Sequence, residues 1–322
     1  IIGNPAIVLP DLLFSDVTNN RIGGTATGQE NVISGQVRLA GSSTTDNYIQ
    51  GNNTQADSGL SVLITDGAHH NHVVDNVISG NSLGIGVEIS DGAHDNRVSR
   101  NLIGTTADGM TAKENSFGVR IDNAPANIIG GDNRNSDFER TEGNLISGNT
   151  QFGVFIFGDQ ARDNRIQGNY IGTDITGNDS LPNGFFNHVG IASGGGVAIQ
   201  DAPSNYIGPA PGDSAGAANL ISGNIGPGIS LFGGGIDPGV SQNNQILHNR
   251  IGTDRTGMFA IGNERSGIMI INSPANVIGS ATTAGFGLIS GNSGPGIHIT
   301  GSEFAGSLAT ENRIVRTMIG TN

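Results

Sequence analysis

Short runs of alternating hydrophobic and polar residues recur along the whole chain. The form Gly-Val-x-Ile is seen at Val87 to Ile89, and each such run is followed by Asn-x-Ile and then by x-Ile-Gly or Leu-Ile-Ser-Gly. Alternation over three to five positions gives a strand with one buried face. The pattern predicts three short strands per unit, restarted about ten times. The other runs of the first kind are Val119 to Ile121, Val154 to Ile156, Val197 to Ile199, Ile229 to Leu231, Ile268 to Ile270 and Ile297 to Ile299.

Longer phrases repeat as well. Asn76-Val77-Ile78-Ser79-Gly80-Asn81 returns at residues 144–149 and 219–224, and once more from Leu288. Self-similarity of this kind is typical of a solenoid, in which each unit stacks on the previous one. We therefore expect Ile146, Ile221 and Ile289 to lie in one column.

Strands this short, separated by Gly and Asn, cannot form hairpins with matched arms. They can stack on the same strand of the next coil, which gives parallel sheets along an axis. Asn recurring at one corner suits a left-handed backbone conformation, and its amide can bond to the equivalent Asn one coil away. Gly supplies the other corners. The predicted fold is an all-β, single-stranded coil of about ten three-strand turns.

The Gly-Ile-x-Ile and Asn-x-Ile-x-Gly-Asn phrases resemble the right-handed parallel β-helix repeat family, which is the pectate-lyase-like superfamily in its broad sense. The resemblance covers essentially all of residues 1–322 and implies one domain. The chain starts at Ile1 without Met and stops inside a repeated phrase. We therefore expect an excerpt of a longer repeat protein, with head-to-tail contact to flanking repeats.

Composition narrows the functional classes. The chain has no Cys, few charged residues (13%) and a formal net charge of −13, with Lys113 among its few basic residues. Zero Cys removes thiolate chemistry and fits an exported protein. A net negative chain in which the sequence shows no cationic stripe argues against nucleic-acid binding. Nothing approaches the ~18 apolar residues of a membrane span.

Two kinds of insertion alternate along the repeat. One follows the third strand, at residues 104–117, 172–195 and 252–266, and the other follows the second strand, at residues 130–143, 208–218 and 279–287. We expect the first kind to lie beside the Gly-Val-x-Ile sheet, where similar loops of related enzymes wall a substrate groove. Phe185 and Phe186 in the longest loop are expected to pack over Phe155 and Phe157, either as a lid or as a buried satellite cluster, of which the sequence favours the cluster.

One charged cluster is predicted on the outer face of that sheet. Glu88 and Arg120 occupy equivalent positions one coil apart, Asp122 follows Arg120 on the same face, and Lys113 arrives on the neighbouring loop. The cluster could be a lyase site, with a carboxylate-bound cation acidifying the substrate and Arg or Lys taking the proton. The alternative is an ordinary cross-strand ion pair on a solvated face, and the sequence favours this interpretation.

Two further patterns invite a metal. His69 is predicted to lie directly under His94 at the first corner, where the two imidazoles could hold Zn or Cu, although an exposed polar turn explains them as well. Asp174 and Asp254 stand in Gly-Thr-Asp-x-Thr-Gly turns that could bind calcium, or that could cap their own backbone amides. Calcium is therefore the one cofactor to consider, and none is required.

The motifs that the resemblance would attach to hydrolysis or epimerisation are absent. Clustered Asp pairs and Gly-His-Gly are not found, and Asp237-Pro238-Gly239 lacks the His of Asp-Pro-His. The sequence favours a non-enzymatic extracellular or cell-surface segment with a structural, adhesion or spacer role, in contact with polysaccharide or matrix. The alternatives are a polysaccharide lyase acting in a groove over the first sheet, and a carbohydrate-binding tailspike-like shaft.

Overall fold

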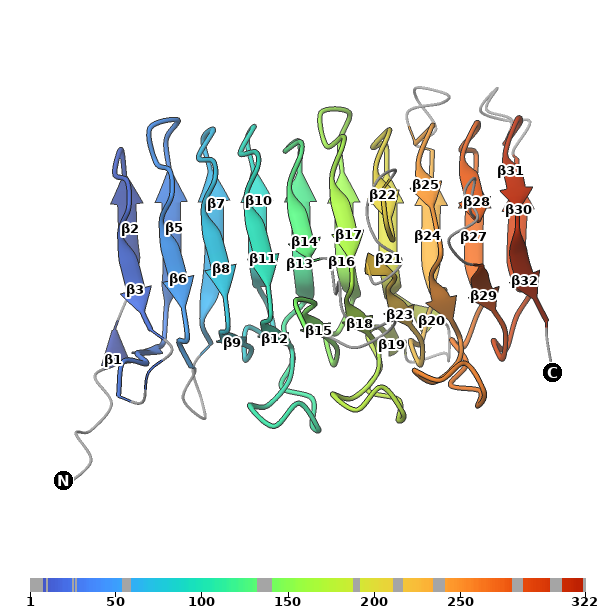
Figure 1. Ribbon diagram of the computed structural model, residues 1–322, viewed down its shortest axis with the longest axis horizontal. Helices are drawn as coiled ribbons and strands as arrows, with labels where there is room; N and C mark the ends of the chain where they lie inside the picture. Colours follow the sequence, from blue (N-terminus) through green and yellow to red (C-terminus); the bar gives the residue numbers. More distant parts are fainter. Residues whose placement is uncertain are drawn as a thin grey trace.

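Three parallel sheets wind around one axis in the computed structural model (Figure 1). The structure describes residues 8–9, 11–24, 26, 28–53, 59–131, 141–187, 192–210, 217–233, 241–279, 286–301 and 309–320. Each coil runs through the first, second and third sheet in turn and then restarts one strand further along. The predicted right-handed parallel β-helix is confirmed.

The strands of each sheet follow one another in chain order. The first sheet holds β2 (Leu12–Ser15), β5 (Gln36–Ala40), β7 (Ser61–Thr65), β10 (Ile85–Ser90), β13 (Phe117–Asp122), β16 (Phe152–Phe157), β21 (Gly195–Gln200), β24 (Ile229–Phe232), β27 (Ile268–Ile271) and β30 (Ile297–Thr300). The second holds β3 (Arg21–Gly23), β6 (Tyr48–Gln50), β8 (His72–Val74), β11 (Arg97–Ser99), β14 (Ile128–Gly130), β17 (Arg165–Gln167), β22 (Tyr206–Ile207), β25 (Gln245–Ile246), β28 (Val277–Gly279) and β31 (Arg313–Val315). The third holds β9 (Val77–Ile78), β12 (Leu102–Ile103), β15 (Leu145–Ile146), β18 (Tyr170–Ile171), β23 (Leu220–Ile221), β26 (Arg250–Ile251), β29 (Gly287–Ile289) and β32 (Thr317–Ile319).

Two short pairs stand outside these sheets. β1 (Val8–Leu9) pairs in parallel with β4 (Val32–Ile33) near the first coil. β19 (Phe185–Phe186) and β20 (Ala192–Ser193) form an antiparallel hairpin.

Aliphatic columns fill the interior. Ile146, Ile171, Ile221, Ile251 and Ile289 pair in register along the third sheet, and each is almost completely buried. Column stacking of this kind keeps every coil in contact with the next and removes the side chains from water. The predicted alignment of the repeated Ile positions is confirmed.

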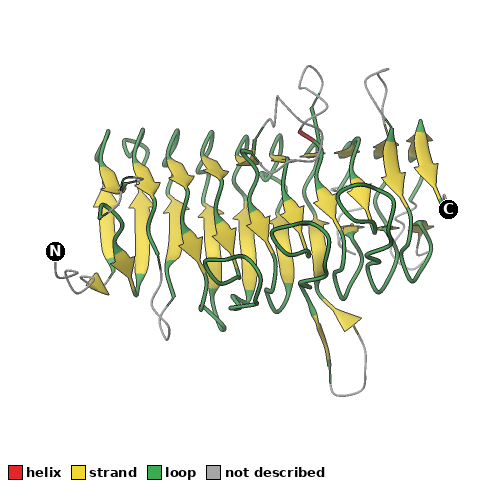
Figure 2. Ribbon diagram, turned by 60° about the horizontal axis from the view of Figure 1, so that its bottom comes forward, coloured by secondary structure: helices red, strands yellow, loops and turns green. Residues whose placement is uncertain are grey.

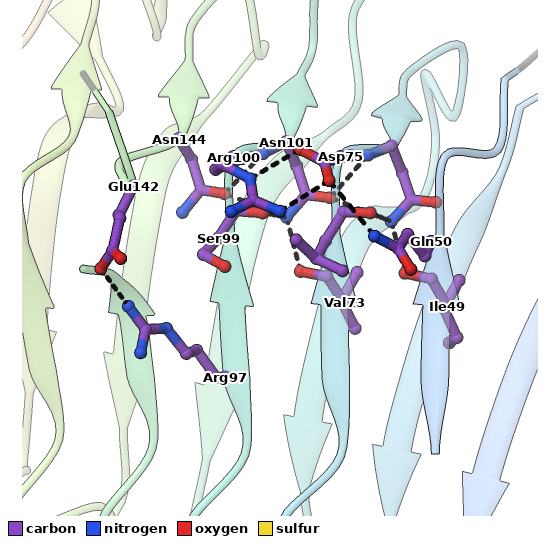
Figure 3. A network of polar contacts seen from close by, with 12 residues as sticks. Ile49, Gln50, Val73, Asp75, Arg97, Ser99, Arg100, Asn101, Glu142 and Asn144 are labelled. Carbon is purple, nitrogen blue, oxygen red and sulfur yellow. Dashed lines mark hydrogen bonds and ion pairs between the residues drawn. The ribbon is translucent and has the colours of Figure 1, made fainter. Parts of the chain in front are cut away.

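Asparagine ladders run along all three corners rather than one. Asn101 donates its backbone N–H and its side-chain Nδ2–H to Oδ1 of Asn144, at 2.9 and 3.0 Å (Figure 3). Asn144 donates in the same way to Asn169, and its second Nδ2–H goes to the carbonyl oxygen of Val98. The expectation of a single Asn corner was wrong. The three sets are Asn20, Asn47, Asn71, Asn96, Asn127, Asn164, Asn205, Asn244, Asn276 and Asn312 between the first and second sheets; Asn31, Asn52, Asn76, Asn101, Asn144, Asn169, Asn219 and Asn249 between the second and third; and Asn81, Asn115, Asn149, Asn183, Asn224, Asn263 and Asn292 before the first strand of the next coil.

The ladder asparagines are not the residues with left-handed backbone geometry. At the first corner the positive φ belongs to the residue just before each ladder Asn, for example Asp95 (φ 55°) before Asn96 and Asp163 (φ 59°) before Asn164. The two roles separate because the ladder needs an inward-pointing amide, whereas the turn needs only a residue that tolerates a positive φ.

The insertions after the third strand fold over the third sheet, and the expectation that they flank the first sheet was wrong. A Cβ on Gly109 would lie 2.8 Å from Ile175 and 3.0 Å from Leu145, so the loop tip rests on the outer face of the third sheet. Leu145, Tyr170 and Leu220 form a separate apolar cluster there, with Leu102 and Ile175 packed against it. This apolar stripe gives the loops a surface to bury.

Successive loops of this kind also bond to one another. Each is a small hairpin, closed by an antiparallel bridge such as Thr105 to Ala112. Ile175 N of the second hairpin donates to Gly109 O of the first. Arg255 N of the third hairpin donates to Gly177 O of the second. Figure 1 shows the three loops side by side below the third sheet. Most of the insertions after the second strand, at residues 132–140, 211–216 and 280–285, lie outside the described residues.

The end of the 172–195 loop leads into the first sheet, where Gly195 begins β21. The β19–β20 hairpin projects away from the rod (Figure 2). Its base meets the first sheet, since Gly195 N donates to Gln151 O. Phe185 and Phe186 are 42% and 52% exposed. They do not form the buried satellite cluster expected from the sequence.

Replacing one ladder residue tests the role of the ladder. Asn144→Ala removes an acceptor of two hydrogen bonds and a donor of two. It leaves the buried backbone N–H of Asn101 without its acceptor, whereas Asn101 Nδ2 keeps the carbonyl oxygens of Val73 and Ser99. We expect a loss of about 3 kcal/mol or more in the free energy of unfolding, measured by urea titration. Asn178→Ala, in an exposed turn, should change it by less than about 0.5 kcal/mol. Equal effects would contradict the ladder's role.

Candidate functional site

The charged cluster forms on the outer face of the first sheet as predicted. β10 and β13 pair in parallel, with Glu88 opposite Arg120 and Ser90 opposite Asp122. Opposite residues of neighbouring strands have Cα atoms about 5 Å apart. Three of the four predicted residues are therefore side by side on two adjacent coils.

Arg120 is held mainly by its own strand. Its Nη2 donates to Oδ2 of Asp122 at 2.5 Å, and the two side chains are 31% and 22% exposed. Asp122 also accepts from Nδ2 of Asn123 at 3.0 Å. The Arg120 Nε is buried without a hydrogen-bond partner among the described residues. The strongest ion pair of the cluster thus lies within β13, whereas the sequence suggested a pair between the coils.

Burial raises the pKa of Glu88 above its ordinary value of 4.5. The positive charge of Arg120 acts in the opposite direction, and the carboxylates of Asp122 and Asp91 add to the rise. Desolvation disfavours the ionised form of a carboxyl, so Glu88 holds its proton to higher pH than an exposed Glu. A group of this kind can exchange a proton with a ligand nearer neutral pH.

A phenylalanine cluster lies directly beside these charges. It consists of Phe117, Phe152, Phe155 and Phe157. The ring of Phe155 is 5.6 Å from that of Phe117 and 5.7 Å from that of Phe152, in stacked orientations. Phe155 pairs with Arg120 across the two strands. The patch therefore combines two carboxyls and a guanidinium with a half-buried aromatic surface.

Of the four phenylalanines, the sequence pattern predicts an outward-facing side chain only for Phe155 and Phe157. Phe117 and Phe152 come before the Gly-Val-x-Ile strands. A Cβ on Gly118 or Gly153 would contact the core residue Ile146 or Ile171. Because this Gly faces inward, the preceding residue turns outward. The repeated Phe-Gly-Val phrase was the signal that could have revealed the larger cluster.

Buried positions bound the patch toward the C-terminus. Ala198 and Ser230 continue the Phe155 column, and both are fully buried. The next outward position is held by Phe232, opposite Gln200. The exposed cluster therefore covers the coils of β10, β13 and β16.

Lys113 is positioned by the third corner. Its N–H donates to Gly104 O, and its own carbonyl oxygen accepts from Gly80 N. Its Cε lies 3.1 Å from the Cβ position of Gly80. These contacts hold the residue at the base of the hairpin on the third sheet, while the other three predicted residues are on first-sheet strands.

His69 and His94 lie one above the other as predicted. Their rings are stacked with centroids 4.9 Å apart. His69 Nδ1 is 2.7 Å from His70 Nδ1, and His94 Nδ1 is 2.8 Å from Asp95 Oδ2. Within the described ranges, no group of three or more His, Cys, Asp or Glu residues is arranged to hold a metal ion. A metal role for His69 and His94 stays a prediction.

Asp174 and Asp254 bind their own turns. The carboxylate of Asp254 accepts from Thr256 Oγ1, Met258 N and Phe259 N, and that of Asp174 accepts from Thr176 Oγ1 and two backbone amides. Burial alone would raise the pKa of Asp254, but the bonds from Thr256, Phe259 and Met258 together lower it. The acid oxygens are thus engaged in capping. Calcium at these turns stays a prediction.

Two hollows lie elsewhere, near the C-terminal end. One of about 680 Å³ is lined by residues of the third hairpin and the last coils, including Thr253, Met258 and Phe259. The other, of about 520 Å³, lies over the second sheet and includes Gln245, Arg313 and Arg316. Neither is lined by Glu88, Arg120 or Asp122.

The chain resembles solved structures rather than known sequences. No known protein family matches the chain by sequence, and no curated protein does. Solved structures with a similar trace include the A-module of mannuronan C-5 epimerase AlgE6 from Azotobacter vinelandii, with 14% identity over 99% of this chain and 92% of that one and a TM-score of 0.41. A double mutant of the periplasmic alginate epimerase AlgG has 14% identity over 98% of this chain and 78% of that one, with a TM-score of 0.46. The A-module of mannuronan C-5 epimerase AlgE4 from Azotobacter vinelandii has 12% identity over 91% of each chain, with a TM-score of 0.31.

The chain is a right-handed parallel β-helix, as its three parallel sheets define it. Identities and TM-scores this low carry no argument about activity. The segment Asp237-Pro238-Gly239, which the sequence set beside an epimerase motif, lies outside the described residues. Within the part of the chain that the structure describes, no helix is long and apolar enough to cross a membrane.

The environment of Glu88 predicts a pH effect on stability. A carboxyl whose pKa is higher in the folded than in the unfolded state stabilises the fold below the unfolded value, and this contribution is lost as pH rises through the folded value. The wild-type chain should therefore lose stability as pH rises from 4.5 through the raised pKa. Glu88→Gln should remove that component of the pH profile, measured by urea unfolding between about pH 4 and 7. An unchanged profile would show that Glu88 is as well solvated as an exposed acid.

Proposed function

We propose that the chain is an extracellular β-helical rod, a structural, adhesion or spacer segment of a surface or secreted protein. The observation that carries the proposal is the continuity of the three asparagine ladders along the coils. A ladder joins each coil to both neighbours through buried bonds, so the molecule resists bending and local opening. Length and stiffness are the properties that a spacer needs.

The polar residues that could perform chemistry support the same function. Arg120 is paired with Asp122 on its own strand, and Arg38 on β5 is paired with Asp66, which follows β7 on the next coil. Asp174 and Asp254 cap their own turns. These side chains satisfy one another or the backbone, as expected of groups with a structural role.

An activity panel tests this proposal. The chain is incubated with pectate, alginate and hyaluronan, and both the ultraviolet absorbance of unsaturated sugar products and the polymer length are followed. The rod should give no product above that of the Arg120→Ala variant. An antibody should also label intact producing cells, as an extracellular location requires. Product formation that Arg120→Ala abolishes would overturn the non-enzymatic proposal.

A second candidate function, a carbohydrate-active enzyme acting on the first sheet, is favoured by one specific observation. Glu88 is half-buried with a raised pKa, next to a guanidinium and to the phenylalanine cluster. Aromatic surface beside carboxyl and Arg groups suits a sugar ring, which offers apolar C–H faces and hydroxyls. The exposed Phe185 and Phe186 stand on the hairpin whose base joins this sheet.

The same panel separates the two functions with a matched control. For an enzyme at this patch, Glu88→Gln and Arg120→Ala should each reduce product formation at least 100-fold, about 2.7 kcal/mol in the activation free energy. Arg38→Ala should leave it unchanged, because Arg38 lies two strands from Glu88 and has its own partner, Asp66. A comparable loss in all three variants would point to damaged folding and count against catalysis at Glu88.

A further inference from the structure

Four arginines stand in the outward column of the second sheet, each two to four coils from the next. In register, the outward positions are Arg21, Tyr48, His72, Arg97, Ile128, Arg165, Tyr206, Gln245, Val277 and Arg313. Successive members of this column are 24 to 41 residues apart in the sequence and become neighbours only through the winding.

Most of this column is engaged in structural contacts. Arg97 donates to Glu142 at 2.6 Å, and Arg100 at the adjacent corner pairs with Asp75 (Figure 3). Arg21 lies over the ring of Tyr48, and Arg165 lies over the ring of Tyr206. These contacts neutralise or cover the cations, which makes the N-terminal part of the column an ordinary solvated face.

The C-terminal end of the same face is different. A hollow of about 520 Å³ spans the last three coils over β25, β28 and β31, which stack at that end of the rod in Figure 1. Its lining residues are Asn243, Gln245, Ala275, Val277, Arg313, Val315 and Arg316. The volume falls within the ~300–1,000 Å³ typical of ligand pockets.

Two guanidiniums line this hollow, and neither forms an ion pair with another described residue. Arg316 lies over the ring of Phe286 at 5.3 Å, which limits its freedom. Glu311, two residues before Arg313, is the acid nearest in sequence and lies on the corner that also carries Asn243 and Ala275. Among the described residues of this corner, two exposed guanidiniums stand against one carboxylate, which favours an anionic ligand even though the chain as a whole is acidic.

The remaining lining residues narrow the ligand class. Val277, Ala275 and Val315 give the hollow an apolar floor, and the amides of Asn243 and Gln245 can bond to hydroxyls. Arginine presents a planar fork that matches a carboxylate in a bidentate manner. A small inorganic anion would use the charges and leave the apolar floor in water. An acidic sugar would use the charges, the floor and the amides together.

We propose that this hollow is a binding site for a carboxylate-bearing saccharide, such as one residue of a uronic-acid polymer. Arg313 and Arg316 bind the carboxylate, Val277 and Ala275 lie under the ring, and Gln245 and Asn243 contact hydroxyls. The site is on the second sheet, so it depends neither on the charged cluster around Glu88 nor on either proposed function.

Isothermal titration of the full chain tests the proposal, with trigalacturonic acid as the probe. We expect saturable binding that weakens as NaCl is raised, because exposed charges are screened. Arg313→Gln and Arg316→Gln should each weaken it at least tenfold. Arg21→Gln, a matched Arg from the same column at the other end of the rod, should bind as the wild type does. Val277→Phe, which fills the hollow without changing its charge, should abolish binding.

Three results would overturn the proposal. The first is no saturable heat with trigalacturonic acid up to millimolar concentration. The second is unchanged affinity in the double variant Arg313→Gln/Arg316→Gln. The third is inorganic phosphate or neutral maltotriose binding as tightly as the acidic trisaccharide at matched ionic strength, which would reveal a general anion site or a general sugar site. Circular dichroism and thermal unfolding of each variant verify that all of them fold, since both arginines are on the surface.

Discussion

The asparagine ladders are the constraint on which the rest of the structure depends. An amide buried without partners is costly, and each ladder Asn avoids that cost only because the next coil supplies an acceptor at the right height. Asn144, for instance, is joined to the coils on both sides through its side chain. The spacing between coils is therefore fixed at the corners as well as by the strands. This allows strands of only two or three residues to form regular sheets.

A fixed coil spacing turns sequence repeats into surface columns. Every outward residue has a neighbour directly above and below it, so a functional patch arises when consecutive repeats place complementary groups at one position. Glu88, Arg120 and Phe155 are such a column. In the same way Gln245, Val277 and Arg313 form one column that lines the hollow on the second sheet. The chemistry of this molecule is thus determined between repeats rather than within one.

Neighbours along the axis could be predicted from the sequence, and neighbours across the surface could not. The pairs of Glu88 with Arg120 and of His69 with His94 follow from the repeat length, and both were predicted correctly. The placement of the long loops was wrong although Leu145, Tyr170 and Leu220, on which the loops rest, are themselves axial neighbours. The course of the loops and the outward turn of Phe117 were both missed for the same reason. They depend on the course of the backbone at each corner, whereas the pattern within a strand reports only its alternation.

The difference between paired and unpaired charges separates structural from functional surface on this rod. An acid that is close in sequence to an arginine, as Asp122 is to Arg120, forms an ion pair locally at little entropic cost. Such a pair needs no ligand to neutralise its charges. Glu88 has no such local partner, and its burial makes ionisation unfavourable, so a ligand cation or proton donor would relieve a cost that the fold itself leaves in place. Arg313 and Arg316 are the cationic counterpart, since the coils around them offer apolar floor and amides but few carboxylates. On a surface built from columns, ligands are therefore expected where the repeat fails to supply a matching charge.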